Sequence, residues 1–209
     1  RRGVIKRTRL DAYSNARKSG LIAIDLDEGD ELAWVRMTDG YQRLIVATRG
    51  GMAICFDEND ARVVGRAARG VKAITLDEGD EVVGMSIRRE GGLLLTVTET
   101  GYGRLSELTD YRIQSRGGKG LTNYHTAEYG DVAGIKVVDP EDDVILISSE
   151  GIIIRMQACE IRLCRRPSKG VRVMRVEEGD RIVSLARMPH EEEQPEEEST
   201  EEAGESAVP

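Results

Sequence analysis

The residues best suited to chemistry lie in the stretch Gln114-Ser115-Arg116-Gly117-Gly118-Lys119-Gly120. Its paired glycines would let the backbone approach a bulky anion and present N–H groups to it, while Arg116 and Lys119 supply positive charge. These properties suit a phosphate backbone, and the stretch has no feature for reading bases.

Three other stretches carry cations at equivalent places: Arg17 and Lys18, then Arg66 and Arg69, then Arg165, Arg166 and Lys169. A single basic loop that contains glycine is usually a solvated turn. Four copies in register favour nucleic acid, because an extended polyanion is the natural ligand of periodic positive charge.

Enzyme signatures fail on inspection. Gly65 and Gly70 have the glycine spacing of a P-loop, but Val71 stands where lysine is required. The two histidines, His125 and His190, have no predictable nucleophile or carboxylate partner. The three cysteines lack the spacing of a metal site, so we expect reduced thiols. The sequence therefore predicts a non-catalytic chain without a metal or cofactor of its own.

A repeat of fifty residues positions these loops. One glycine recurs at equal intervals at the end of each loop, namely Gly20, Gly70, Gly120 and Gly170. Apolar residues follow one, four and six positions later, which predicts a strand interrupted by a bulge or strong twist. A glycine-bearing turn closes each of these strands, at residues 27–30, 77–80, 128–131 and 177–180.

Further strands complete each repeat. We expect a second strand after the turn, as in 31–37 and 81–87, and a third, as in 44–48, 93–98 and 144–148. A last glycine turn opens the first strand of the next repeat. Four short strands in about fifty residues are typical of an all-β, propeller-like array whose blades cover each other's faces. Four acids also recur in register, and we interpret them as caps that pair with loop arginines: Asp11, Asp60, Asp110 and Glu160.

The net charge of -8 is concentrated at one end of the chain. Residues 191–209 hold nine of the 38 acidic residues and no Lys or Arg, which leaves 30 basic and 29 acidic residues in 1–190. We therefore predict one domain over 1–190 and a disordered acidic tail over 191–209. No apolar run is long enough to cross a membrane, and nothing resembles a signal peptide, so we expect a cytoplasmic protein.

The stretch 114–120 resembles the Gln-Arg-Arg-Gly-Gly-Lys-Gly box in the C-terminal domain of the DNA gyrase A subunit, with Ser115 as its one departure. Similar features surround it, including Thr100-Gly101-Tyr102-Gly103 before the box and the Glu-rich tail. The resemblance implies a β-pinwheel, whose blades exchange strands and whose rim wraps DNA. Family domains have six blades with the principal box in the first, so this chain is expected to be a fragment of about four blades with a secondary box.

The resemblance also implies a role and partners. The chain would bind duplex DNA without sequence preference and support ATP-dependent negative supercoiling. Its partners would be the ATPase subunit of an A2B2 holoenzyme and the N-terminal region of its own subunit. ATP, Mg²⁺ and the catalytic tyrosine would belong to these other parts of the holoenzyme. The predicted DNA contacts are Gln114, Arg116, Gly117, Gly118, Lys119, Gly120, Arg17, Lys18, Arg66, Arg69, Arg165, Arg166 and Lys169. Two alternatives stay open: a topoisomerase IV-type C-terminal domain, and a propeller-like scaffold that binds an acidic protein.

Overall fold

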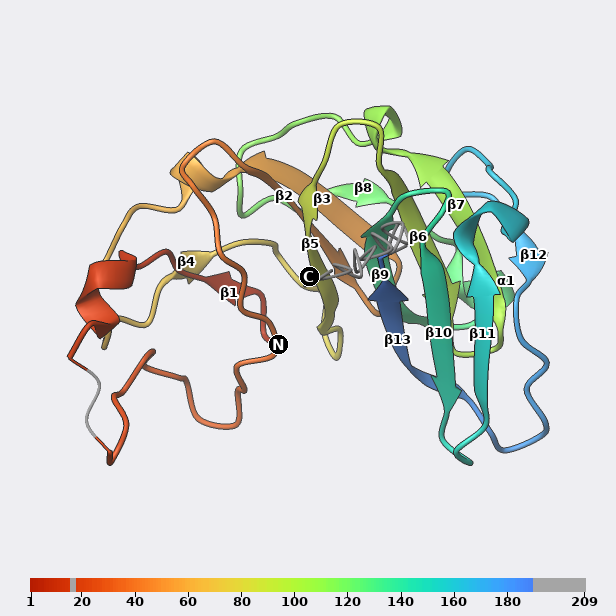
Figure 1. The fold of residues 1–209 in the computed structure, drawn as a ribbon, viewed down its shortest axis with the longest axis horizontal. Coiled ribbons are helices and arrows are strands. Elements are labelled where there is room, and N and C mark those ends of the chain that lie inside the picture. The colour runs from red at the N-terminus through yellow and green to blue at the C-terminus, as the bar shows by residue number, and fades with distance from the viewer. Residues whose placement is uncertain (16–17, 190–209) are drawn as a thin grey trace, which may run out of the picture.

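The computed structural model describes residues 1–15 and 18–189, so Arg17 and the expected tail over 191–209 lie outside the described residues. The described part is all-β, as predicted, and its strands form an arc (Figure 1). The strands are β1 (Val4–Ile5), β2 (Arg43–Thr48), β3 (Met52–Asp57), β4 (Val71–Lys72), β5 (Val82–Arg88), β6 (Leu93–Thr98), β7 (Tyr102–Glu107), β8 (Leu121–Thr122), β9 (Val132–Val138), β10 (Asp143–Ser148), β11 (Ile153–Gln157), β12 (Val171–Arg172) and β13 (Ile182–Met188). Short 3₁₀ helices span Leu10–Tyr13, Glu58–Asp60, Leu108–Asp110 and Ala158–Glu160, and α1 spans Thr126–Tyr129.

Each blade is assembled from more than one repeat. Blade I has the strand order β5-β2-β3-β8, blade II has β12-β7-β6-β9, and blade III has β11-β10-β13. The β2–β3 hairpin in the middle of blade I comes from one repeat. The outer strands β5 and β8 belong to the next two repeats, in that order. This is the strand exchange that the family resemblance implied, and it ties neighbouring repeats to each other.

The strand after each recurring glycine is shorter than the spacing of apolar residues predicted. The strands β4, β8 and β12 contain two residues each, so the irregular spacing reflects an early strand end and not a bulge within the strand. Register shifts do occur in the structure, but they lie where β2, β6 and β10 meet β5, β9 and β13. In the third repeat the chain forms α1 where a plain turn was expected.

The cores lie between blades, because both faces of the central strands β2 and β6 are buried. In β2, Leu44 and Val46 pack with Phe56 and Ile74 on one side, while Ile45 and Ala47 pack toward blade II on the other. Strand side chains alternate between faces, so the strand contributes to two cores at once. Burying such an aliphatic side chain stabilises the fold by about 1.5–3 kcal/mol, which makes the contact between blades a main source of stability.

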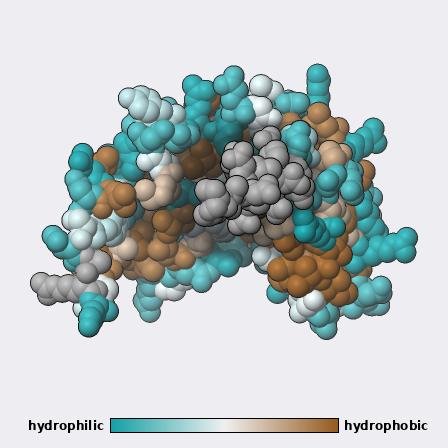
Figure 2. All heavy atoms as spheres, viewed as in Figure 1, coloured by the Kyte–Doolittle hydropathy of each residue, from teal (hydrophilic) through white to brown (hydrophobic). Residues whose placement is uncertain are grey.

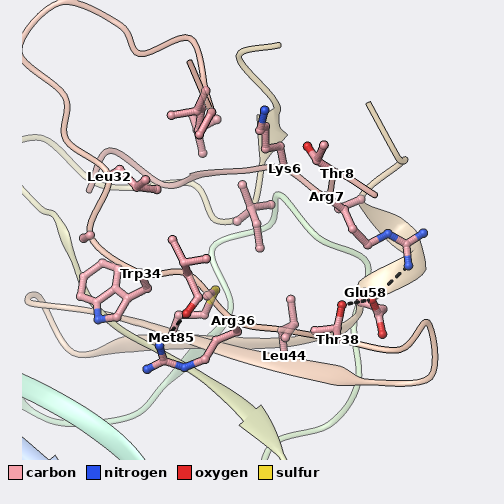
Figure 3. A pocket seen from close by; sticks show the side chains of 18 of the residues that line it. Lys6, Arg7, Thr8, Leu32, Trp34, Arg36, Thr38, Leu44, Glu58 and Met85 are labelled. Carbon is pink, nitrogen blue, oxygen red and sulfur yellow. Dashed lines mark hydrogen bonds and ion pairs between the residues drawn. The ribbon is translucent and has the colours of Figure 1, made fainter. Parts of the chain in front are cut away.

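The N-terminal unit, residues 1–42 with β4, has a sheet of two strands, β1 and β4, among the described residues. Residues 31–37 were expected to form a strand, but the structure assigns none there. The equivalent strands β5, β9 and β13 each pair with a strand of the preceding repeat, whereas residues 31–37 have no strand partner among the described residues. A hollow of about 780 Å³ lies at this place, lined by Leu32, Trp34, Leu44 and Met85 among others (Figure 3).

Exposed apolar surface accordingly gathers at the two ends of the arc (Figure 2). At the N-terminal end it includes Leu32, Val35 and Met37, and in blade III it includes Ile152 and Ile153. Along the described residues, no helix is both long enough and apolar enough to cross a membrane.

Candidate nucleic-acid interface

Three loops run along the convex edge of the arc (Figure 1). They span residues 58–70, 108–120 and 158–170, each begins with a 3₁₀ helix, and each ends at β4, β8 or β12. Because those short strands belong to the preceding blade, every loop crosses from one blade back to its neighbour. The strand exchange therefore places the loops of successive repeats in register along one edge.

The recurring glycine is required where the loop meets the preceding blade. Gly70, Gly120 and Gly170 all have positive φ, between 74° and 105°. A Cβ on Gly120 would lie 2.3 Å from the carbonyl oxygen of Ala53, a contact that no side chain tolerates. The glycine thus allows the loop to lie against the backbone of the neighbouring strand.

The arginine four residues before each recurring glycine fastens the loop. Arg116 donates from Nε to the carbonyl oxygen of Asp60 at 2.8 Å and from Nη1 to that of Lys72 at 2.9 Å. Arg166 makes the same two hydrogen bonds one repeat later, and Arg66 makes the second of them. These side chains are partly buried, so much of their donor capacity serves the fold.

The recurring acids take part in this fastening through their main chains. The carbonyl oxygens of Asp60 and Asp110 accept from loop arginines, whereas the Asp11 carboxylate pairs with Arg9 at 2.8 Å, so the expected acid–arginine pairing uses a carboxylate only at Asp11 among these three. The carboxyl groups that cap turns are others: Asp80 accepts from the amides of Gly50 and Glu81, and Asp180 makes the equivalent contacts in blade III.

The glycines of the stretch 114–120 also serve contact between blades. The amide of Gly117 donates to the carbonyl oxygen of Ala73 at 2.6 Å, and the Gly117 and Gly118 carbonyl oxygens accept from Thr75. The Gly117 N–H is therefore not presented to a ligand, contrary to the role we expected for the paired glycines. Gln114 likewise uses its backbone amide, which donates to Cys55.

Among the predicted contacts, each loop has an exposed cation immediately before the recurring glycine. These residues are Arg69, Lys119 and Lys169, and Lys18 and Arg165 are exposed as well. Arg69 pairs with Asp27, and Lys119 pairs with Asp77 at 2.5 Å. The hydrogen bond from Arg69 holds the pKa of Asp27 below its usual value. The predicted set thus contains partly buried arginines, which hold the loops by hydrogen bonds, and exposed cations. Contact of either group with DNA stays a prediction.

Sequence reasoning missed the aromatic residues beside Lys169. Its ammonium lies 4.2 Å from the ring centre of Tyr102 and 5.3 Å from that of Tyr129, and Arg172 donates to the Tyr102 hydroxyl at 2.9 Å. The signal was present in the sequence: Ala127 occupies the place held by Asp27 and Asp77 in the earlier repeats, which removes the partner of the loop cation.

A family model described as "DNA gyrase C-terminal domain, beta-propeller" matches residues 1–39, 42–87, 92–139 and 142–187. The chain belongs to this family. The four matched segments correspond to the four repeats, and their agreement with the observed strand exchange identifies the fold as the β-pinwheel of gyrase C-terminal domains.

Curated proteins similar to this chain are named as DNA gyrase A subunits. The DNA gyrase A subunit of Halalkalibacterium halodurans is 55% identical over 202 residues, which make up 96% of this chain and 24% of that protein. Its counterpart from Clostridium acetobutylicum is 43% identical over 90% of this chain and 23% of its own length. The gyrase-family chain therefore spans about a quarter of these curated relatives.

Two solved structures superpose closely on this gyrase-family domain. The C-terminal domain of DNA topoisomerase IV aligns with a TM-score of 0.84 and 29% identity, over 90% of this chain and 59% of that one. The DNA gyrase A C-terminal domain aligns with a TM-score of 0.80 and 26% identity, over 90% of this chain and 63% of that one.

Proposed function

We propose that this chain binds and bends duplex DNA along its convex edge, as part of the DNA-wrapping region of a gyrase A subunit. The single observation that carries the proposal is the register of the loops. Three loops with an exposed cation at the same position lie on one edge of a pinwheel of the gyrase family. A polyanion that follows this edge would meet the cations in succession, without any need to read bases.

The role in the whole protein follows from the family. The chain would present a bent DNA segment to the other domains of its own subunit, which in turn joins the ATPase subunit in an A2B2 enzyme of the cytoplasm that is associated with the chromosome. ATP, Mg²⁺ and the tyrosine that cleaves DNA would belong to those other parts. The domain would thereby support negative supercoiling. Its own contribution would be contacts with phosphates that stabilise the bent form of the DNA.

Salt dependence tests the proposal. Five exposed cations of the predicted set, Lys18, Arg69, Lys119, Arg165 and Lys169, are available for phosphate. If three to five of them neutralise a phosphate, depending on whether Arg69 and Lys119 leave their carboxylate partners, log K should fall with log salt with a slope of roughly -2.7 to -4.5. Anisotropy titrations of labelled duplexes of different sequence measure this slope. A flat response, or strong preference for one site among equally bendable duplexes, would overturn the proposal.

Two other functions remain testable on the same molecule. The structural match to topoisomerase IV favours a C-terminal domain of that enzyme as second candidate, whereas the stretch 114–120 resembles the gyrase box. Wrapping can be distinguished from simple binding with closed circular DNA that is relaxed while the chain is bound. After the protein is removed, only DNA that was wrapped has a changed linking number. A scaffold for an acidic protein would show no retention on DNA at low salt.

A further inference from the structure

The cation before each recurring glycine has a carboxylate partner in two loops. Arg69 pairs with Asp27, and Lys119 pairs with Asp77 at 2.5 Å. Each acid comes from the turn of the preceding repeat, so the same pair forms twice by repetition of the fold. At these two positions the local charge is close to zero, and a phosphate must displace a carboxylate in order to bind.

The next loop lacks this acid. Ala127 stands fifty residues after Asp77, and Tyr129 and Gly130 occupy the places of Gly79 and Asp80. The turn forms α1, and the Tyr129 ring lies beside that of Tyr102, with 6.4 Å between the ring centres. Lys169 therefore faces two aromatic rings where Lys119 faces a carboxylate.

A second cation completes the cluster. Arg172 is exposed, its guanidinium carbon lies 5.1 Å from the ring centre of Tyr102, and its Nη2 donates to the Tyr102 hydroxyl at 2.9 Å. The hydrogen bonds from Arg172 and Lys169 lower the pKa of Tyr102. Within the described residues neither cation makes an ion pair, and the acid of this turn, Glu128, lies instead beside Tyr129, where it raises the pKa of the Tyr129 hydroxyl.

Two side chains hold the backbone at Ser168 and Lys169 by hydrogen bonds. Arg104 is fully buried, and its Nε donates to the carbonyl oxygen of Ser168 at 3.0 Å, while the Tyr124 hydroxyl donates to that of Lys169. Neither anchor has a counterpart in the other repeats, where Ile54 and Ile154 stand in place of Arg104. A loop fixed in this way loses little conformational freedom when a ligand binds.

We propose that Lys169, Arg172 and the Tyr102 hydroxyl form a phosphate site that anchors the DNA backbone more tightly than the equivalent positions at Lys119 and Arg69. The inference rests on the proposed function. It adds that the strength of phosphate binding differs between the loops along the convex edge. An unpaired cation gains the full attraction of a phosphate, whereas a paired one exchanges one anion for another. The aromatic rings hold the two cations close together through cation–π contacts and add no negative charge.

Reciprocal substitutions test the inference in the 209-residue chain. Lys169→Ala with Arg172→Ala should make the salt slope shallower by about 1.8, the value for two phosphate contacts. Lys119→Ala should change it by less than about 0.5, because Asp77 already neutralises that lysine. Asp77→Ala should strengthen binding about two- to fivefold by releasing Lys119. Ala127→Asp should weaken binding, and Ala127→Asn, its uncharged match, should not.

Anisotropy with a labelled duplex gives the affinities, and thermal unfolding of each variant confirms that it is folded. Equal effects of Lys119→Ala and the double substitution, or equal binding by Ala127→Asp and Ala127→Asn, would overturn the inference while leaving the proposed function standing. Failure of the parent chain to bind DNA would instead remove the proposed function. Competition by inorganic phosphate as strong as by duplex would show a site for free phosphate, which also contradicts DNA anchoring.

Discussion

The loop arginines show how one residue type can serve the fold and the surface at once. Arg116 and Arg166 each place the planar fork of the guanidinium on two carbonyl oxygens of the preceding blade. Lysine carries its three donors on one nitrogen, so it cannot reproduce the planar fork in which two separate nitrogens reach the two oxygens. The sequence predicted these residues as phosphate contacts because charge is visible in a sequence, whereas the carbonyl oxygens that accept from them become neighbours only after folding.

Arg116→Lys should therefore destabilise the fold although it keeps the charge. We expect the free energy of unfolding to fall by about 1–2 kcal/mol, because two charge-assisted hydrogen bonds between blades are lost or weakened. Urea denaturation measures this change, and Arg112→Lys, an exposed neighbour, is the matched control. If Arg116→Lys unfolds at the same urea concentration as the parent, the fastening contributes nothing to stability.

We expect the carboxyl group of Asp180 to make the stability of the fold depend on pH under acid conditions. Desolvation raises its pKa, but hydrogen bonds from Ser148, Ser149 and the amides of Arg181 and Glu150 outweigh this effect and lower the pKa to about 2. The folded-state pKa thus lies below the ordinary value of 3.8. The resulting stabilisation is present above the unfolded pKa and is lost as the pH falls through the folded pKa.

Between about pH 4 and pH 2, Asp180→Asn should lose less thermal stability than the parent, because it no longer exchanges this proton on unfolding. Melting temperatures measured by circular dichroism across that range provide the comparison. Glu178→Gln, in the same turn but exposed, should follow the parent. Parallel curves for the parent and Asp180→Asn would show that Asp180 does not control acid unfolding.

At the scale of elements, periodicity predicted which segments exist, and hydrogen-bond partners decided which became strands. Residues 31–37 have the same pattern as β5, yet they form no strand, and no strand among the described residues lies beside them as β2 lies beside β5. The recurring glycines and their loops were predicted well, since their signal is local. The exchange of strands between blades came only from the family resemblance, because spacing along a chain does not say which edges meet.

The recurring glycines offer a matched pair of substitutions. Gly20 and Gly120 have nearly the same φ, 79° and 82°, but a Cβ at Gly20 meets nothing within 4 Å, whereas one at Gly120 would meet the Ala53 carbonyl oxygen at 2.3 Å. Gly20→Ala should cost about 1–2 kcal/mol of backbone strain alone. Gly120→Ala should cost several kcal/mol more, because the loop must move away from β3.

Urea denaturation of the two variants measures the difference. Similar stabilities would mean that the close approach of the loop to β3 is not needed, and that the glycine serves only its backbone conformation. A larger loss in Gly20→Ala would contradict the account altogether.

At the scale of the molecule, the arc is most stable in the middle and least stable at the N-terminal unit. β2 and β6 are each paired on both sides and buried on both faces, while residues 32–38 have no strand partner among the described residues. Amide hydrogen exchange should therefore be slowest in β2 and β6 and fastest in 32–38, because local opening follows missing pairing and burial. Uniform protection measured by mass spectrometry would contradict this gradient.

The overall charge was a poor guide to the surface, as the near-neutral balance of 1–190 already suggested. What matters is where the carboxylates fall: Asp27 and Asp77 neutralise two loop cations, and Ala127 leaves the third without a partner. A sequence comparison of the repeats could have shown this substitution, but its effect on Lys169 depends on the side chains that the fold brings beside it.

The exchange of strands also sets a schedule for synthesis on the ribosome. Blade I runs from Arg43 to Thr122, so the ribosome must translate about 80 residues before its last strand exists. At about 5–20 residues per second, that takes roughly 4–16 s. During this time the β2–β3 hairpin first gains β5 and waits longest for β8, which leaves the outer edge of β3 open. A slow codon between β5 and β8 would prolong that exposure, whereas one placed after Thr122 would leave blade I unaffected.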